Sequence, residues 1–170
     1  MNDTTNSNEQ RNELWELIGD VRFAMFTTRN GSGELHSRPM TTQNRKDDHD
    51  DSLWFFMSRK SDPVEELKQD PAVNVAYADP SDDSYVSVCG NAEVVEDDAK
   101  KRELWNKMTE AWFPGGPSDP DVALVRVRII SAEYWDVKSP QPVQLYKMAK
   151  AVVTGKPPTD MGHHGEVRMR

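Results

Sequence analysis

The sequence is short of cysteine, and this scarcity excludes a disulfide framework. Cys89 is the only cysteine among 170 residues, so neither an intramolecular disulfide nor a redox pair of thiols can form. A chain without disulfides is typical of the cytoplasm, and we expect that location. No cation neighbours Cys89 within its predicted strand, which favours a small core residue over a nucleophile.

Long apolar runs and an excess of positive charge are also missing. No run of about 18 apolar residues occurs, so no membrane-spanning segment is predicted. The 29 acidic and 21 basic residues give a net charge of −8, which argues against binding to nucleic acid or to an anionic membrane. An anionic ligand would therefore need a local cluster of basic groups.

The chain is predicted to form a single domain, because no internal repeat or linker divides it. Residues 1–8 lack the basic start and apolar centre of a signal peptide, and we expect a disordered leader there. The domain is expected to span residues 9–155. Residues 156–170 are expected to be a polar tail.

Hydrophobic periodicity predicts short helices and six strands within the domain. Helices are expected at residues 9–18, 63–69, 97–112 and 145–153. Strands are expected at residues 21–29, 35–42, 53–57, 72–78, 85–95 and 125–136, with a bulge or close backbone approach at Gly90. Hairpins without regular βαβ alternation predict a mainly β protein, a closed or split antiparallel barrel with peripheral helices. No Gly-x-Gly-x-x-Gly follows a strand, which disfavours a Rossmann sheet.

Residues 53–67 join an aromatic strand directly to a capped helix. Asp62 is the expected N-cap, Pro63 the first helical residue, and Glu65 the residue that closes a capping box. The turn at residues 58–61 offers hydroxyls, cations and free amides, which are groups that bind phosphate at a helix start. The alternative is an ordinary solvated turn, and the Asp62 carboxylate counts against an anion.

Two histidine-containing segments are candidates for a metal site. His49 lies among aspartates in a charged loop, and His163 and His164 lie between glycines with no thiol or carboxylate at a suitable spacing. A solvated loop and a polar tail explain them better, so no metal is expected.

Five short motifs, taken in order, resemble the general stress protein 26 family. They are His36-Ser37-Arg38-Pro39-Met40, Trp54-Phe55-Phe56 with Ser61, Trp112-Phe113-Pro114-Gly115-Gly116-Pro117, Ala132-Glu133-Tyr134-Trp135-Asp136 and Thr154-Gly155-Lys156. That family belongs to the FMN-binding split barrels, which are related to pyridoxamine-phosphate oxidases. The resemblance covers about residues 13 to 169. It implies a six-stranded antiparallel split barrel, FMN or FAD as cofactor, and a homodimer with the flavin at the subunit interface.

The resemblance also implies which residues bind the flavin. Arg38 matches the phosphate arginine, and a guanidinium gives a phosphate two parallel charged hydrogen bonds. The implied ring contacts come from two strands and, across the interface, from a second subunit: Pro39, Met40, Thr41, Phe56, Met57, Ser58, Trp112 and Phe113. On the residues alone, Arg38 fits a surface ion pair equally well, and Trp112 fits the core face of its helix.

Pro63 departs from the family pattern, in which a lysine is common at this position. Proline supplies neither charge nor amide, so two phosphate contacts are lost. Lys60, three residues earlier, together with Ser61 and Arg38, can still form a cluster around a phosphate.

No catalytic acid, base or nucleophile stands out in the sequence. A flavin carries out hydride and electron transfer with its own ring, so this absence does not decide whether the protein is an enzyme. The leading hypothesis is a flavin-dependent oxidoreductase of unknown substrate, or a flavin-carrying stress protein. The alternatives are a non-catalytic flavin store or sensor and a dimer whose cofactor site has decayed.

Overall fold

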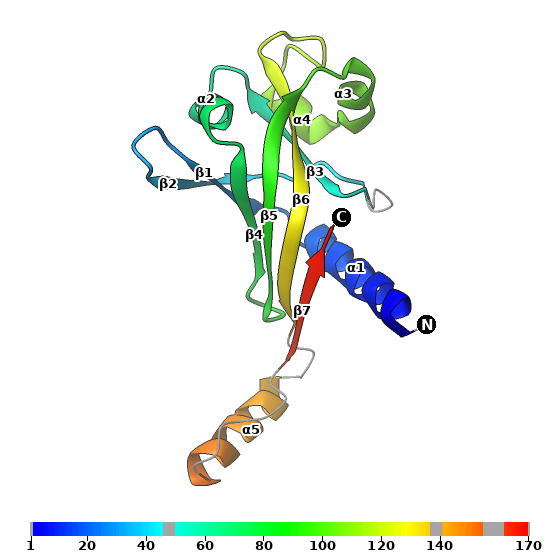
Figure 1. The fold of residues 1–170 in the computed structure, drawn as a ribbon, viewed down its shortest axis with the longest axis vertical. Coiled ribbons are helices and arrows are strands. Elements are labelled where there is room, and N and C mark those ends of the chain that lie inside the picture. Colours follow the sequence, from blue (N-terminus) through cyan, green and yellow to red (C-terminus); the bar gives the residue numbers. More distant parts are fainter. Residues whose placement is uncertain (1, 46–49, 137–140, 155–161, 170) are drawn as a thin grey trace.

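The structure is a computed structural model that describes residues 2–45, 50–136, 141–154 and 162–169 (Figure 1). The helices are α1 (Asn2–Asp20), α2 (Asp62–Gln69), α3 (Asp98–Leu104), α4 (Lys107–Trp112) and α5 (Gln141–Thr154). The strands are β1 (Ala24–Arg29), β2 (Leu35–Met40), β3 (Ser52–Ser58), β4 (Ala72–Asp79), β5 (Ser84–Val95), β6 (Val122–Asp136) and β7 (His163–Arg168).

All the strands pair antiparallel in one sheet, in the order β2-β1-β4-β5-β6-β3, and β7 also pairs with β6. The 15-residue strand β6 pairs along one edge with β5. Its other edge is divided, because residues 122–128 pair with β3 and residues 131–136 pair with β7. The sheet therefore forks along β6.

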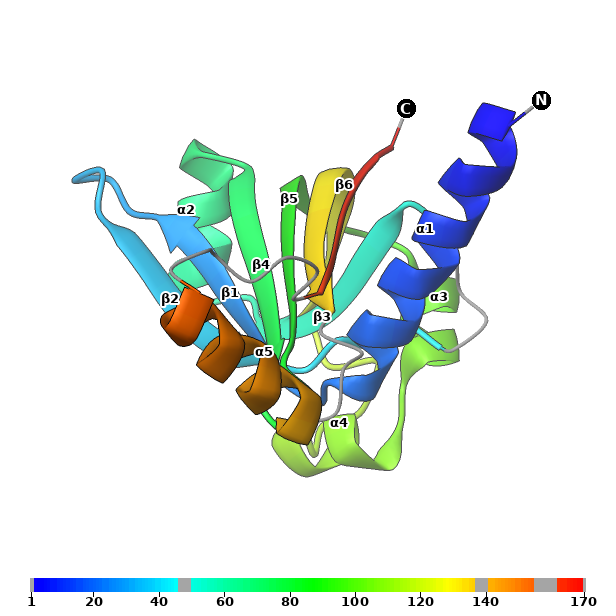
Figure 2. The ribbon, with the colours of Figure 1, turned by 90° about the horizontal axis from the view of Figure 1, so that it is seen from below.

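The two ends of the strand order meet and close a barrel. The backbone N–H of Gln43, just after β2, donates to the carbonyl of Trp54 in β3 at 2.8 Å. The Asn44 side chain accepts from the Trp54 N–H at 2.9 Å and donates to the Ser52 carbonyl at 2.8 Å. Figure 2 shows the strands curving from β2 round to β3. The predicted antiparallel split barrel is confirmed.

Strand β3 is buried on both faces, and it separates two hydrophobic clusters. Leu53, Phe55 and Met57 belong to the larger cluster that fills the barrel. Trp54 and Phe56 point the other way, into a smaller cluster that also contains Leu104, Val122 and Leu124. A strand covered on both faces needs apolar residues in succession, which the predicted aromatic strand provides.

The structure adds a seventh strand, β7, where a polar tail was expected. Only Gly165 and Val167 are buried in this strand, so its sequence carries almost no alternating apolar signal. Backbone hydrogen bonds to β6 hold it instead, and these do not depend on side-chain type. The expectation of six strands was therefore one short.

Residues 2–8, predicted to be disordered, form the first turns of α1. Extending an existing helix fixes one residue per added hydrogen bond, whereas starting a new one fixes several. Polar residues can therefore continue a helix whose core contacts lie further along, at Leu14 and Ile18.

Cys89 is exposed, so the expectation of a core cysteine was wrong. Along β5 the inward positions belong to Val86 and Val88, and Cys89 follows on the outer face. Its sulfur lies 3.6 Å from the Asn74 amide nitrogen on the neighbouring strand.

Among the helices that the structure describes, none is both long enough and apolar enough to cross a bilayer.

The predicted irregularity at Gly90 is confirmed. The register between β5 and β6 shifts between Cys89 and Gly90. A Cβ atom at Gly90 would lie 2.4 Å from the carbonyl oxygen of Arg128 and 2.8 Å from a methyl group of Val127. Only glycine permits this approach of the two backbones.

We predict that Gly90→Ala lowers the free energy of unfolding by about 1–3 kcal/mol, because the new methyl group must displace the backbone of β6. Gly19→Ala is the control, since nothing lies within 4 Å of a Cβ there and Gly19 is helical. That change should stabilise by up to about 1 kcal/mol. Urea unfolding of both variants measures the effects, and equal stability of the two would contradict the close approach.

Candidate functional site

One cavity brings together most of the residues predicted to bind a ligand. It has a volume of about 410 Å³ and lies between β2, β3, the turn after β3, and α4. Ten of the eleven predicted residues line it: Arg38, Pro39, Met40, Thr41, Phe56, Met57, Ser58, Ser61, Trp112 and Phe113. The sequence reading missed five further lining residues: Phe23, Gln43, Pro63, Met108 and Thr109.

The β2 wall of the cavity depends on an edge strand. β2 pairs only with β1 in the sheet order, so Pro39, which has no N–H to donate, is accommodated within it. Arg38 and Met40 are half-buried in this strand, whereas its first three residues are exposed. The strand is therefore more buried at its end, where it lines the cavity, than at its start.

The turn after β3 is held by its own hydroxyl groups. The Ser61 hydroxyl donates to the Ser58 carbonyl at 2.6 Å, and the Ser58 hydroxyl donates to the Asp121 carboxylate at 3.0 Å. The Arg59 guanidinium contacts Glu96 at 2.7 Å, and this hydrogen bond lowers the pKa of the Glu96 carboxyl. Both serines thus already donate within the protein.

The helix start differs from the predicted capping box. Ser61, not Asp62, is the N-cap of α2, and its side chain makes no capping hydrogen bond. Glu65 accepts from Lys68 at 2.6 Å instead of reaching back to the cap. Pro63 occupies the first turn and is buried. Proline has no N–H for a cap to accept, and the Ser61 hydroxyl is directed to the Ser58 carbonyl instead.

Lys60 is the predicted site residue that the structure does not bring to the cavity. Its side chain is 86% exposed, and its ammonium lies 3.5 Å from an oxygen of Asp121. The ammonium is thus paired at the surface of the turn.

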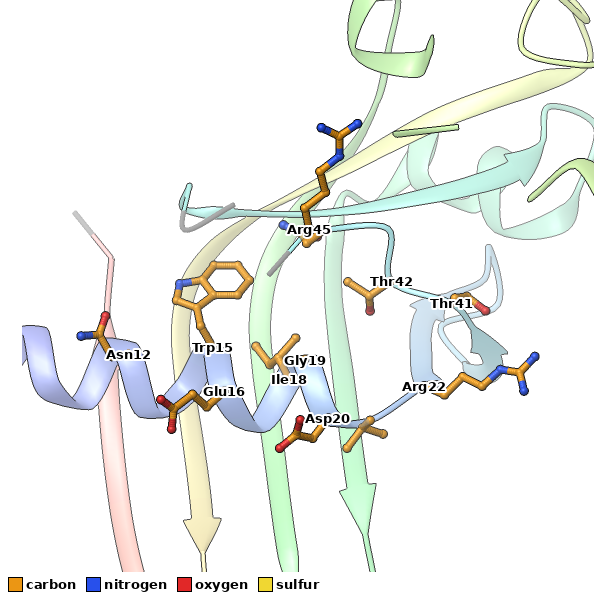
Figure 3. Close-up of a pocket in the computed structure, with 12 residues that line it drawn as sticks. Asn12, Trp15, Glu16, Ile18, Gly19, Asp20, Arg22, Thr41, Thr42 and Arg45 are labelled. Carbon is orange, nitrogen blue, oxygen red and sulfur yellow. The ribbon is translucent and has the colours of Figure 1, made fainter. Parts of the chain in front are cut away.

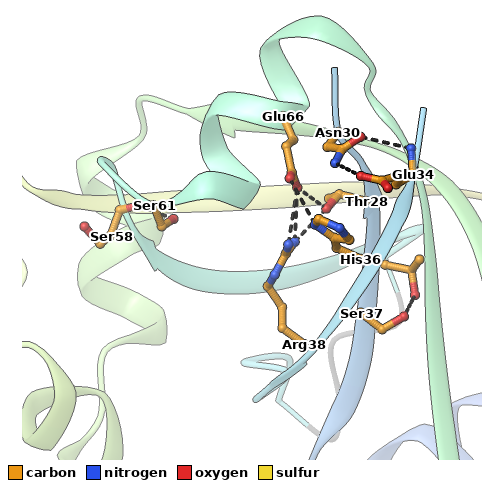
Figure 4. Close-up of polar contacts among 10 residues, drawn as sticks. Thr28, Asn30, Glu34, His36, Ser37, Arg38, Ser58, Ser61 and Glu66 are labelled. Atoms are coloured by element: carbon orange, nitrogen blue, oxygen red, sulfur yellow. Dashed lines mark hydrogen bonds and ion pairs between the residues drawn. The ribbon is translucent and has the colours of Figure 1, made fainter. Parts of the chain in front are cut away.

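Arg38 lines the cavity but is already paired (Figure 4). Its Nη1 donates to the Thr28 hydroxyl at 2.6 Å, and both Nη1 and Nη2 lie 3.3 Å from one oxygen of Glu66. The Thr28 hydroxyl also donates to that oxygen, and His36 Nδ1 lies 3.8 Å from the other one. Arg38 thus forms an ion pair, but a partly buried one and not the surface pair that the residues alone suggested. Its role toward a phosphate stays a prediction. Nothing in the sequence marked Thr28 or Glu66.

The helical segment that carries Trp112 is two helices, not the single predicted one. α3 ends at Leu104, and the Asn106 side chain caps α4 by accepting from the N–H groups of Met108 and Thr109, each at 3.0 Å. After the break Met108 is exposed, whereas Thr109 stays buried. Trp112 is 79% exposed, so the interpretation of Trp112 as a core residue was wrong.

Aromatic side chains connect the second hydrophobic cluster to the cavity wall. Phe56 packs edge-on against Trp105, with 5.2 Å between ring centroids, and Trp105 lies 6.5 Å from Phe113. Trp112 and Phe113 line the cavity together with Arg38 of the same chain. The expectation that a second subunit contributes Trp112 and Phe113 to a site stays a prediction.

A second, larger cavity of about 650 Å³ lies between α1 and residues 41–45 (Figure 3). Its lining mixes the acids Glu16 and Asp20 with the cations Arg22 and Arg45, and of the predicted residues it includes only Thr41. The smaller cavity has the continuous apolar and aromatic walls that typify ligand sites. We therefore take the smaller cavity as the candidate site.

The histidines do not build a metal site in the parts of the chain that the structure describes. No group of three or more metal-ligating side chains occurs among those residues. His163 and His164 lie in β7, and the His164 ring stacks on Trp135 with 5.3 Å between centroids. His49, and Gly155 and Lys156 of the last motif, lie outside the described residues.

Comparison with known proteins settles the family. Residues 9–159 match the sequence pattern of the family described as pyridoxamine 5'-phosphate oxidase like. The chain belongs to this family. Protein bli-3 of Neurospora crassa is 31% identical over 157 residues, which cover 87% of this chain and 75% of that protein.

Solved structures agree with this family membership. A protein assigned as general stress protein 26 from Jannaschia sp. CCS1 has a TM-score of 0.73 at 29% identity, covering 96% of this chain and 99% of that one. A general stress FMN/FAD binding protein from Xanthomonas citri has a TM-score of 0.68 at 29% identity, covering 78% of this chain and 92% of that one. The pyridoxamine 5'-phosphate oxidase-like chain thus resembles general stress proteins in sequence and fold.

We predict that Trp112→Ala leaves the free energy of unfolding within about 0.5 kcal/mol of the original, because the side chain is mostly exposed. Leu104→Ala is the matched change in α3, where the side chain is 3% exposed, and should destabilise by about 2–5 kcal/mol. Guanidinium unfolding curves measure both. A large loss in Trp112→Ala would restore the core interpretation.

Proposed function

We propose that this protein is a flavin-binding general stress protein that holds FMN, or FAD, in the 410 Å³ cavity. The observation that carries the proposal is the convergence of ten predicted flavin contacts on one cavity, although they come from three separate stretches of sequence. The Xanthomonas citri relative, a general stress FMN/FAD binding protein, supports the choice of ligand.

The residues around the cavity fit a flavin. A planar, partly apolar ring system is matched by flat and apolar side chains, which here are Pro39, Met40, Phe56, Met57 and Phe113. Arg38 supplies a cation at the cavity wall for a phosphate, and Gln43 and Thr109 supply polar groups. Trp112 would shield a bound ring from water. When bound, the flavin would supply hydride and electron transfer.

We further propose that the protein is an oxidoreductase of unknown substrate. A non-catalytic flavin store or sensor is the second candidate. A dimer with a decayed cofactor site is the third, and two observations favour it: Glu66 already pairs with Arg38, and Pro63 stands at the position of the common lysine. Turnover of NADH or NADPH in the presence of flavin would distinguish the enzyme from the store.

A homodimer is proposed on the distribution of exposed apolar residues. On α5, Tyr146, Met148 and Val152 are 68%, 53% and 84% exposed, and Figure 1 shows this helix standing away from the barrel. Trp112 and Met108 are also exposed at the cavity. A second copy that covers such surfaces would remove them from water.

We also propose a cytoplasmic location, where the exposed free Cys89 would remain reduced.

Arg38→Ala should weaken FMN binding by about 2 kcal/mol, the contribution of hydrogen bonds to a charged group. Riboflavin, which lacks the phosphate, should be affected far less. Quenching of flavin fluorescence measures both affinities. Arg29→Ala is the control, because that guanidinium lies at the surface, 3.7 Å from Asp70, and does not line the cavity.

Two results would contradict this assignment. Equal losses for FMN and riboflavin in Arg38→Ala would mean that the arginine shapes the barrel without binding phosphate. If neither FMN nor FAD changes its fluorescence at protein concentrations well above micromolar, the flavin proposal itself fails.

Sedimentation velocity is expected to give twice the mass of the chain. Replacing Met148 and Val152 together by lysine should shift the population toward monomer, because both side chains would then carry charge into the covered surface. Lys150→Ala, an exposed change on the same helix, is the control. A monomer that binds flavin with full affinity would refute the dimer but not the flavin site.

A further inference from the structure

Helix α2 places a carboxylate directly against the arginine of the candidate site (Figure 4). The Glu66 side chain is only 11% exposed and the Arg38 side chain 23%. One Glu66 oxygen lies 3.3 Å from both Nη1 and Nη2 and accepts from the Thr28 hydroxyl as well. This contact is therefore a fixed, partly buried ion pair and not a solvated surface one.

Some of the guanidinium donors that a phosphate could use are already engaged by Glu66 and Thr28. A bidentate contact from arginine to a phosphate uses two parallel N–H groups of the guanidinium. In this structure Nη1 and Nη2 both point to Glu66, and Nη1 also donates to Thr28. A phosphate that bound Arg38 would have to displace the carboxylate or lie close beside it.

Other charges near this wall do not compensate for Glu66. Asp62 lies in the first turn of α2, and Pro63 contributes neither a charge nor an N–H. The Lys60 ammonium pairs with Asp121. His36 Nδ1 lies 3.8 Å from the Glu66 oxygen that does not contact Arg38. Arg38 and Glu66 therefore neutralise each other, and a phosphate dianion would meet a like charge.

We propose that Glu66 sets the selectivity of this cavity between phosphorylated and unphosphorylated ring ligands, by competing with the ligand's phosphate for Arg38. The inference rests on the proposed function, which it deepens. Glu66 would lower, without abolishing, the preference for FMN over riboflavin that Arg38 provides.

Glu66→Gln is the test, because glutamine keeps an oxygen that can accept from Arg38 and Thr28 but removes the charge. FMN should bind about tenfold more tightly, equivalent to about 1.4 kcal/mol, while the riboflavin affinity should change by less than about twofold. Isothermal titration of each flavin gives the ratio directly.

Glu65→Gln is the matched control. It removes the same charge from the neighbouring position of α2, but Glu65 is 58% exposed and pairs with Lys68. The ratio of its affinities for FMN and riboflavin should stay at the value of the original protein. The gain from Glu66→Gln should also disappear when Arg38 is replaced by alanine in the same chain, since the two residues act through one contact.

Two outcomes overturn the inference. Weaker FMN binding in Glu66→Gln with unchanged riboflavin binding would show that Glu66 orients Arg38 toward the phosphate. Equal changes for both flavins would show that it has no role in selectivity.

A titration with inorganic phosphate separates this inference from the flavin proposal. In an NMR titration, the chemical shift of Arg38 Nε reports whether phosphate reaches the guanidinium. It should shift at lower phosphate concentration in Glu66→Gln than in the original protein or in Glu65→Gln. If neither flavin binds, the proposed function fails, and this titration alone decides the role of Glu66: no shift in Glu66→Gln then refutes it.

Discussion

The burial of β3 on both faces is the constraint on which the candidate site depends. One face completes the barrel core through Phe55, while the other face packs Phe56 against Trp105 and the helices beside it. Because β3 is fixed from both sides, the turn that follows it and the start of α2 have a defined position. The cavity is therefore built on a rigid strand, with only its outer wall formed by α4.

Local patterns were enough to predict most of this architecture. The aromatic strand, the helix after it and the bulge at Gly90 each leave a signal within a few neighbouring residues. The break at Asn106 was missed because Leu104, Met108 and Trp112 satisfy helical spacing whether or not the helix continues. β7 was missed because an edge strand held by backbone hydrogen bonds requires little apolar sequence.

The charge environment of the site was the part that could not be predicted. Arg38 and Glu66 are 28 residues apart, and they meet because α2 packs against β1, the strand with which β2 pairs. A motif identifies the arginine, but its chemistry depends on a partner that no local pattern indicates. The same holds for Lys60, whose place in the sequence suggested an anion site while its side chain turns toward Asp121.

The divided edge of β6 gives the two halves of this strand different partners. The half paired with β3 supports the cavity, whereas the half paired with β7 carries Trp135 and its stacked histidine. Fraying of β7 would release amide groups for hydrogen exchange along residues 131–136 without loosening the pairing of β3. Slow exchange beside the cavity and fast exchange at the far end are thus compatible with one continuous strand.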